Sequence, residues 1–156
     1  MVRIGNSRIN GQGLFAVQDI TKGTRIITYI GEKITRKESA RRLEAGNAYI
    51  FHLNYRYALD GETLANTARY INHSCDPNCE ALITGKKIFI HALRGIYPGT
   101  ELAYDYQYER TGRNDAKLEK FYLCKCGAEN CRGSIMKPAK KRSQASQTSR
   151  SRSRRK

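Results

Sequence analysis

The stretch NHSCDPNC, residues 72 to 79, gathers two cysteines, a histidine, two asparagines and an aspartate around one proline. Three interpretations compete for it. It could supply half of a metal site, a Cys/His catalytic pair, or a tight turn that happens to hold cysteines. The rest of the chain has to decide among these three interpretations.

The length and composition of the chain indicate one globular domain. A chain of 156 residues suits a single core, and 39% hydrophobic with 28% charged residues is typical of a soluble protein. The apolar run KIFIHAL, residues 87 to 93, is too short to span a bilayer. The N-terminal MVRIGNSRINGQG lacks the apolar centre of a signal peptide. We therefore expect an intracellular protein.

The net charge of +15 is unevenly distributed. Residues 137 to 156, KPAKKRSQASQTSRSRSRRK, hold nine Lys and Arg and no acid, whereas the other 136 residues carry 20 basic and 14 acidic side chains. A segment without large apolar side chains cannot offset its ordering entropy, so we expect a disordered tail. Its charge favours nucleic acid or nuclear targeting, and a merely solubilising tail is the alternative.

Most of the remaining chain predicts short β-strands, because β-branched and aromatic residues alternate with turn residues. Strands are expected within TRIITYI (24–30), YIFHL (49–53), RYALDG (56–61), a hairpin EALITGKKIFIHAL (80–93) around Gly85, and YPGTELAYDY (97–106). The segment TRKESARRLEAG (35–46) predicts a helix. Thr35 and Glu38 match a capping box, and Gly46 is placed to end the helix. The expected fold is mainly β with one or two short helices.

The cysteines indicate a metal site. CKCGAENC, residues 124 to 131, has the spacing C-x-C-x4-C, which places three thiols in one loop. A structural zinc site takes four ligands in a tetrahedron, so a fourth must come from elsewhere in the chain. Cys75, Cys79 and His73 are the candidates. Buried free cysteines are the alternative, but the clustering favours metal, since intracellular cysteine clusters more often bind metal than form disulfides.

These segments, in this order, resemble the SET-domain protein-lysine N-methyltransferases with a post-SET zinc motif. The segments are GQGLFA (11–16), YIGEKIT (29–35), ARYINHSCDPNC (68–79), GTELAYDY (99–106) and CKCGAENC (124–131). The resemblance implies a SET-domain fold of short strands with a pseudoknot, in which the NHSC segment passes near the chain that carries Tyr106. It implies a SET domain over residues 1–110, a post-SET zinc-binding segment over 111–136 and a disordered basic tail over 137–156.

The resemblance also implies the site residues and the cofactors. Tyr106 matches the catalytic tyrosine, Tyr29 matches a tyrosine that lines the lysine channel, and Tyr104 resembles the switch that limits how many methyl groups fit. The methyl donor would be S-adenosylmethionine, held by residues of the glycine loop and of the NHSC region: Gly11, Gln12, Gly13, Leu14, Tyr49, Arg69, Asn72 and His73.

The resemblance also implies two roles for the five cysteines, metal binding and packing. Cys75 is expected to complete a structural Zn²⁺ site with Cys124, Cys126 and Cys131. Cys79 is then left as a packed free thiol. Asp76 and Asn78, in the DPN turn, are expected to make local backbone hydrogen bonds.

The expected activity is mainly monomethylation, with some dimethylation, of a lysine in a histone or a histone-like DNA-binding protein. Three acids are candidates for the channel mouth, Glu109, Asp115 and Glu119. Lys137, Lys140 and Lys141 are candidates for automethylation. The sequence shows no cysteine-rich segment ahead of the matched core, so relatives that use one are expected to be poor guides to specificity.

Partners and location follow from the same interpretation. We expect the nucleus and chromatin, including a host nucleus, or a bacterial nucleoid, with nucleic acid as a further partner of the basic tail. One alternative is a catalytically silent SET fold that binds chromatin or nucleic acid through the tail. A weaker one is a metal-dependent hydrolase.

Overall fold

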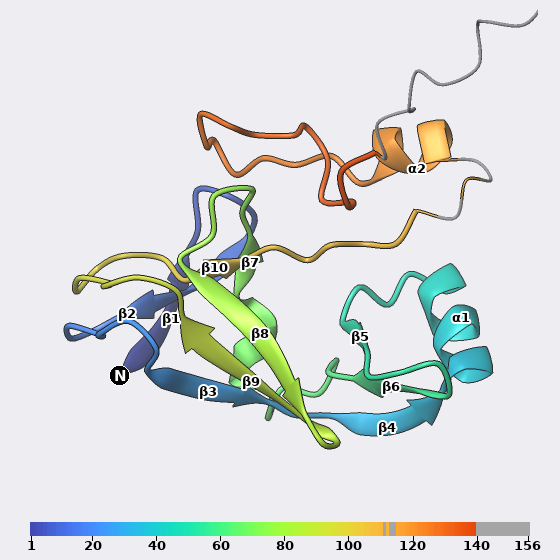
Figure 1. Cartoon of the computed structure of the whole chain (residues 1–156), viewed down its shortest axis with the longest axis horizontal. Helices are drawn as coiled ribbons and strands as arrows, with labels where there is room; N and C mark the ends of the chain where they lie inside the picture. The colour runs from blue at the N-terminus through green and yellow to red at the C-terminus, as the bar shows by residue number, and fades with distance from the viewer. Residues whose placement is uncertain (111, 113–114, 140–156) are drawn as a thin grey trace, which may run out of the picture.

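The computed structural model describes residues 1–110, 112 and 115–139, so most of the predicted basic tail lies outside the described residues. Within these ranges short strands form four small sheets, which lie around one core (Figure 1). Few residues are helical. The mainly β fold expected from the sequence is therefore confirmed. None of the helices in the described ranges has the length and apolar character that crossing a membrane requires.

Two of the sheets have three strands and two have two strands. The three-stranded sheets are β3 (Arg25–Tyr29), β9 (Lys87–Ala92) and β8 (Cys79–Thr84), and β4 (Glu32–Thr35), β6 (Tyr57–Asp60) and β5 (Ile50–His52), each in that spatial order and antiparallel. The two-stranded sheets are the antiparallel pair β1 (Val2–Asn6) and β2 (Gln12–Ala16), and the parallel pair β7 (Asn72–His73) and β10 (Ala103–Tyr104).

The hairpin of β8 and β9 shows why the sequence folds in this way. Gly85 has a φ of 63°, a value that a tight turn demands and that glycine adopts without steric cost. Along β9, Ile88 and Ile90 are fully buried while the residues between and beside them are more exposed, as the two-residue period of a strand requires. These isoleucines pack with Leu14 and Leu102 in the core.

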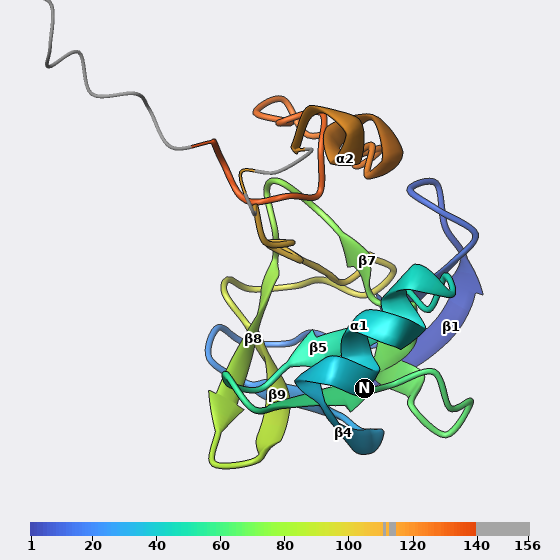
Figure 2. The same ribbon diagram turned by 90° about the vertical axis from the view of Figure 1, so that its right-hand side faces the viewer.

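Helix α1 (Arg36–Glu44) packs against the sheet of β4, β6 and β5 (Figure 2). Thr35 caps it, because its hydroxyl accepts a hydrogen bond from the Glu38 N–H at 3.2 Å, and Gly46 follows its end with a φ of 94°. The second half of the expected capping box differs. The Glu38 carboxylate accepts hydrogen bonds from Arg41 and Arg42, since these cations lie one turn further along the same face.

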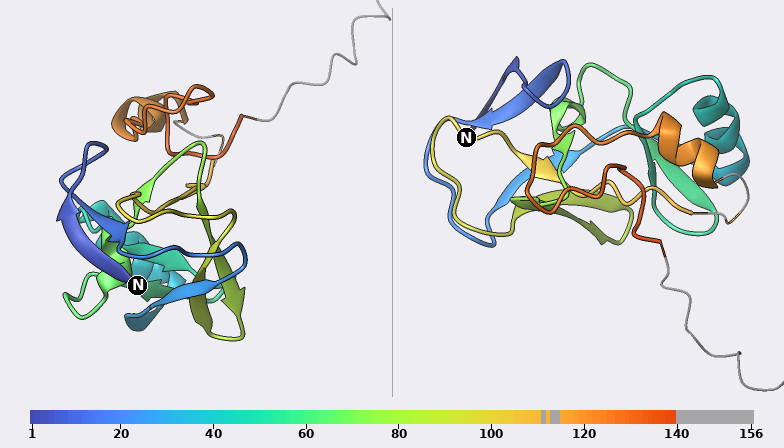
Figure 3. Two further views of the ribbon diagram at one scale, coloured as in Figure 1. Left: turned by 90° about the vertical axis from the view of Figure 1, so that its left-hand side faces the viewer. Right: turned by 90° about the horizontal axis from the view of Figure 1, so that it is seen from above.

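The C-terminal part of the described chain covers the end of the molecule where β7 and β10 lie (Figures 1 and 3). It contains the short helix α2 (Asp115–Phe121) and then the segment with the three clustered cysteines. Between β6 and β7, a single turn of 3-10 helix, η1 (Thr67–Tyr70), brings the chain into the NHSC segment. Segments that are far apart in the sequence therefore meet at one place.

Candidate active site and cysteine cluster

The parallel pair β7 and β10 places the NHSC segment beside the segment that carries Tyr106. Asn72 pairs with Ala103 and His73 with Tyr104, and the Tyr106 N–H donates to His73 Nδ1 at 3.1 Å. The two segments therefore lie side by side, as the resemblance to the SET domain implied. Tyr104, Tyr106 and Tyr108 all face one cavity.

These tyrosines line a cavity of about 1180 Å³ that the described residues enclose in part. The ring centroids of Tyr104 and Tyr106 are 4.9 Å apart, and those of Tyr106 and Tyr108 are 5.9 Å apart. Tyr29 and Tyr49 contribute to the same cavity. The wall is therefore aromatic and carries several phenol groups.

The two hydroxyls expected to touch the reacting groups are fixed by backbone carbonyls. The Tyr106 hydroxyl donates to the carbonyl of Ile71 at 2.8 Å, and the Tyr29 hydroxyl donates to the carbonyl of Tyr49 at 2.9 Å. Burial raises the pKa of both phenols above the ordinary range, so both stay protonated. A phenol that donates its only hydrogen keeps oxygen lone pairs, so each oxygen can accept a hydrogen bond from an amine.

A second wall of the cavity is formed by the loop before β2. The Asn72 side-chain amide reaches this loop and donates to the carbonyls of Asn10 and Gln12 at 3.2 and 3.0 Å, and to Glu101 Oε1 at 2.8 Å. Gly11 has a φ of 50°. Asn10, Gly11, Gln12 and Asn72 all line the cavity. Asn72 therefore fixes the glycine loop against β7.

The other residues expected at the donor site divide into two groups. Tyr49 and Arg69 line the cavity, with the guanidinium carbon of Arg69 at 4.0 Å from the centre of the Tyr49 ring. Gly13, Leu14 and His73 are not among the residues of the cavity wall, and Leu14 is fully buried in the core. A side chain at position 13 would meet the Glu101 carboxylate at 2.4 Å, which explains the glycine there.

His73 lies behind this wall and not in it. Burial lowers the pKa of its imidazole to about 4. The neutral ring can thus accept the Tyr106 N–H through Nδ1, while Nε2 lies 3.4 Å from the sulfur of Cys75. His73 therefore links the Tyr106 backbone to the cysteine cluster.

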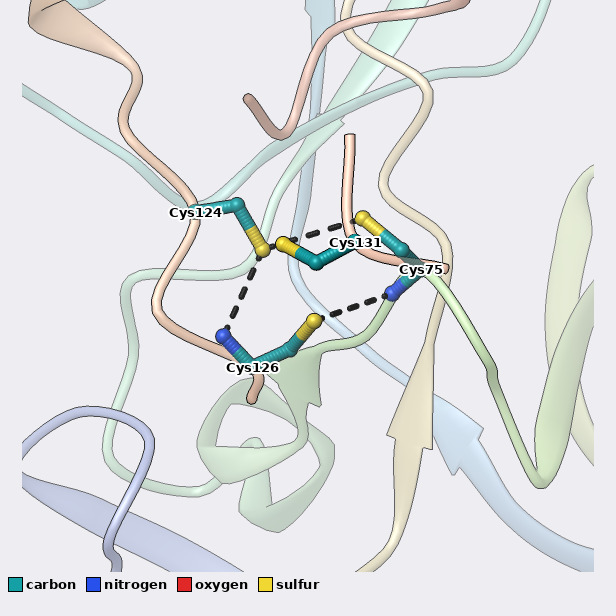
Figure 4. A group of neighbouring side chains, drawn as sticks. All are labelled: Cys75, Cys124, Cys126 and Cys131. Atoms are coloured by element: carbon teal, nitrogen blue, oxygen red, sulfur yellow. Dashed lines mark hydrogen bonds between the residues drawn. The ribbon is translucent and has the colours of Figure 1, made fainter. Parts of the chain in front are cut away.

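The four cysteines expected to bind zinc converge (Figure 4). The sulfurs of Cys75, Cys124, Cys126 and Cys131 all lie within 4.8 Å of one another, and those of Cys75 and Cys124 are 3.8 Å apart. Tetrahedral zinc with Zn–S bonds of about 2.3 Å sets its sulfurs about 3.8 Å apart, so the four-sulfur set fits this metal. The Cys75 backbone N–H donates to the sulfur of Cys126, and the Cys126 backbone N–H donates to the sulfur of Cys124.

Cys79 lies elsewhere, at the start of β8, and is fully buried. Burial raises the pKa of its thiol to about 12, which keeps it protonated. The expected roles of Asp76 and Asn78 need correction. The Asn78 side chain bonds to the backbone of Glu101 and Ala103, 23 and 25 residues away, and Asp76 pairs with Arg94. The local hydrogen bond of the turn is accepted by the Ser74 hydroxyl from the Asp76 N–H.

The structure also brings in residues that the sequence reasoning missed. Tyr108 continues the two-residue spacing of Tyr104 and Tyr106, a signal that could have identified it, and its ring meets Tyr122 at 5.0 Å. Asp105 and Arg132 form an ion pair between the Tyr106 segment and the cysteine segment, for which no local pattern exists. Of the acids expected at the channel mouth, Glu109 pairs with Lys137 and Glu119 with Arg110.

Comparison with known proteins defines the class. The sequence model described as "SET domain" matches residues 11–107. This range contains β7, β10 and the predicted site tyrosines Tyr29, Tyr104 and Tyr106, and it ends before Tyr108. The chain belongs to the SET domain family.

Similar curated proteins share this region. The chain is 36% identical over 142 residues to "Histone-lysine N-methyltransferase, H3 lysine-4 specific" of Aspergillus oryzae, and 36% over 142 residues to the protein of the same name in Saccharomyces cerevisiae. It is 41% identical over 141 residues to "Histone-lysine N-methyltransferase trr" of Drosophila melanogaster. The matches cover 85%, 85% and 84% of this chain, but 11%, 13% and 6% of those proteins. The chain thus spans about a tenth of the length of such relatives.

Proposed function

We propose that the chain is an S-adenosylmethionine-dependent protein-lysine N-methyltransferase that acts on a histone. The observation that carries this proposal is the tyrosine-lined cavity, in which the Tyr29 and Tyr106 hydroxyls both donate to backbone carbonyls. Their free lone pairs suit an incoming amine. Membership of the SET domain family and the names of the similar proteins support the same activity.

The cavity wall is suited to the main energetic difficulty of the reaction, which is to obtain a neutral amine. A free lysine has a pKa of about 10.4, so deprotonation at pH 7 costs roughly 4 to 5 kcal/mol. Burial disfavours charged groups, and it already raises the pKa of Tyr29, Tyr104 and Tyr106. The same low polarity lowers the pKa of a lysine that enters, while Tyr106 orients its nitrogen.

The glycine loop and its neighbours are the proposed donor site. S-adenosylmethionine, when bound, supplies a methyl group activated by an adjacent sulfonium. Asn10, Gly11 and Gln12 present backbone atoms, and Tyr49 and Arg69 present an aromatic and cationic surface. Gly13, Leu14 and His73 would act from behind the wall, by shaping the loop and holding the Tyr106 backbone. This division of roles extends the assignment made from sequence.

The cysteine cluster has a structural role in this proposal. Zinc held by Cys75, Cys124, Cys126 and Cys131 would fix the C-terminal segment beside β7 and take no part in methyl transfer. The proposed boundaries remain those of the sequence: a SET domain over 1–110, a post-SET segment over 111–136 and a basic tail from 137. The tail is the proposed contact for nucleic acid.

The relatives suggest which substrate to test first. Two of them are named as specific for lysine 4 of histone H3, so we propose the H3 tail as substrate and nuclear chromatin as location. Glu109 lines the cavity and pairs with Lys137 at 2.6 Å. A basic substrate segment would compete with Lys137 for this carboxylate. Mainly monomethyl product, with some dimethyl product, is proposed from Tyr104.

Transfer of labelled methyl groups tests the proposal. We expect the chain to label histone H3, H3 with lysine 4 replaced by arginine to be labelled far less, and Tyr106→Phe to lose at least about 100-fold in kcat because the amine is no longer oriented. Tyr97→Phe, at an exposed position, is the control. If no basic protein is labelled while tail-dependent DNA binding persists, the chain is a silent binding module instead.

A further inference from the structure

The side chain of Arg132 joins the cysteine segment to the segment that carries Tyr106. Arg132 directly follows Cys131, and its Nη2 donates to Asp105 Oδ1 at 2.8 Å. Both side chains are largely buried, with 23% and 17% of their surface exposed. The two residues are 27 positions apart, so this contact exists only when the cysteine segment lies against the core.

Asp105 is placed where it can hold the backbone around Tyr106. The same oxygen, Oδ1, accepts the Gln107 N–H at 3.1 Å and lies 3.5 Å from His73 Nδ1, the atom that accepts the Tyr106 N–H. Gln107 has a φ of 50°, in the left-handed region that a residue with a side chain adopts at a cost. Interactions around Asp105 therefore maintain an unfavourable turn directly after Tyr106.

A second set of contacts closes a ring. The Arg132 backbone N–H donates to the sulfur of Cys75 at 3.4 Å, and that sulfur lies 3.4 Å from His73 Nε2. The ring thus passes from Cys75 through His73 to the Tyr106 backbone N–H, continues through the adjacent residue Asp105 to Arg132, and returns to Cys75. It joins one proposed zinc ligand to the backbone of the proposed catalytic tyrosine through side chains on both sides.

The geometry points to Arg132 and Asp105 as a pair of positioning residues, which make the placement of Tyr106 depend on the folded cysteine segment. The pair is poorly arranged for stability alone, because Arg132 Nε is buried and has no hydrogen-bond partner among the described residues. Buried ion pairs whose polar atoms are incompletely matched contribute little net stability. Its effect on catalysis rests on the proposed function, whereas its effect on the Tyr106 backbone does not.

The chain offers a matched comparison pair. Arg94 contacts Asp76, which directly follows Cys75, at 3.3 Å, but these side chains are 54% and 55% exposed. Exposed pairs of this kind contribute little. Arg94→Met and Arg132→Met therefore remove the same group near the same cluster, and only the second interrupts the ring.

The experiment measures amide hydrogen exchange over residues 102–108, zinc content, and kcat and KM on the H3 tail. For Arg132→Met and for Asp105→Asn we expect exchange at Tyr106 and Gln107 to rise about tenfold, which corresponds to about 1.4 kcal/mol, and kcat to fall about tenfold. KM and one zinc per chain should be kept. The double variant should have the same kcat and amide exchange as the more strongly affected single variant, because both substitutions remove the same contact. Arg132→Lys should recover part of the loss, and Arg94→Met should behave as wild type.

Two results would overturn the inference. One is unchanged exchange at Tyr106 in Arg132→Met. The other is loss of zinc from this variant, which would make Arg132 a support of the metal site only. If the wild-type chain transfers no methyl group while exchange and zinc respond as expected, the inference stands and the proposed function fails.

Discussion

At the scale of single residues, Tyr104 is the side chain proposed to limit the number of methyl groups transferred. The side chain is buried beside the rings of Tyr106 and Phe51, and burial raises the pKa of its phenol. If the proposed lysine nitrogen lies next to this buried hydroxyl, the hydroxyl would favour a polar neighbour over a further methyl group. Replacement by phenylalanine changes this balance and leaves the packing nearly unchanged.

We expect Tyr104→Phe to shift the product from monomethyl towards dimethyl and trimethyl lysine. Loss of one polar contact worth about 1.4 kcal/mol changes the rate of the second transfer by about tenfold. Mass spectrometry of the H3 tail over time measures the shift. A wild-type chain that already gives abundant trimethyl lysine would contradict the assignment of Tyr104.

The two cysteines of NHSCDPNC separate metal binding from packing. Cys75→Ser should release zinc and lose activity, because the converging set of four sulfurs becomes three. Cys79→Ser should keep zinc, although a hydroxyl in its fully buried position costs stability. Zinc content by elemental analysis decides the point. The opposite pattern would show that the ligand was assigned to the wrong sulfur.

At the scale of elements, the connection between β6 and η1 determines where Tyr29 points. A Cβ at Gly61 would lie 2.3 Å from Tyr29 Cε1 and 2.5 Å from Asn66 Nδ2, and the Asn66 amide also accepts the Ile30 N–H. The glycine therefore leaves room for the end of β3 and for the tyrosine on it. This close approach is a packing requirement that no turn geometry explains.

Gly61→Ala should destabilise the chain by about 1 to 3 kcal/mol, as overpacking in a tight core does. It should also raise KM for the H3 tail, because Tyr29 has to move. Gly95→Ala is the matched control, since a Cβ at Gly95 meets nothing within 4 Å. Denaturant unfolding measures the free energy of unfolding of both variants. Equal stability of the two variants would show that the Tyr29 ring moves freely.

Local features of the elements were predictable from sequence, and contacts between elements were not. Thr35 at the start of α1 and Gly85 in the β8–β9 turn act through their immediate neighbours, so a few letters suffice. Asn78 looks like a turn residue, yet it bonds across more than twenty positions. The pair of Arg132 and Asp105 has no signal, because its partners meet only after the sheets are assembled. The resemblance to a family supplied the cysteine set.

At the scale of the whole molecule, the described C-terminal segment, residues 115–139, has one short helix and no strand with which to pack against the sheets. Helix α2 has no buried residue, and the segment after it carries three of the four clustered cysteines. The stability of this part of the chain is therefore expected to depend on metal. None of the four clustered cysteines belongs to the hydrophobic core around β3, β8 and β9. Cys75 lies next to this core, in the NHSC segment.

Removal of zinc by a strong chelator should abolish methyl transfer but leave the core folded. We expect limited proteolysis to cut within residues 115–139 first, while circular dichroism keeps its β signal. Added zinc should restore both activity and resistance. Global unfolding on chelation would show that the metal holds the core as well.

The four cysteines also impose an order on folding. Cys124, Cys126 and Cys131 lie within eight residues, so they can capture an ion while the chain is still extended, whereas Cys75 is 49 residues from Cys124. Closing a loop of that length costs about 3 to 3.5 kcal/mol more than contact between adjacent residues. Prior pairing of β7 with β10 lowers this cost, because it shortens the loop that remains to be closed. The fourth sulfur should therefore bind last. On refolding of the complete chain, the three clustered cysteines would hold an ion until the NHSC segment is in place, so a slow, metal-dependent final phase is the expected signature in refolding kinetics.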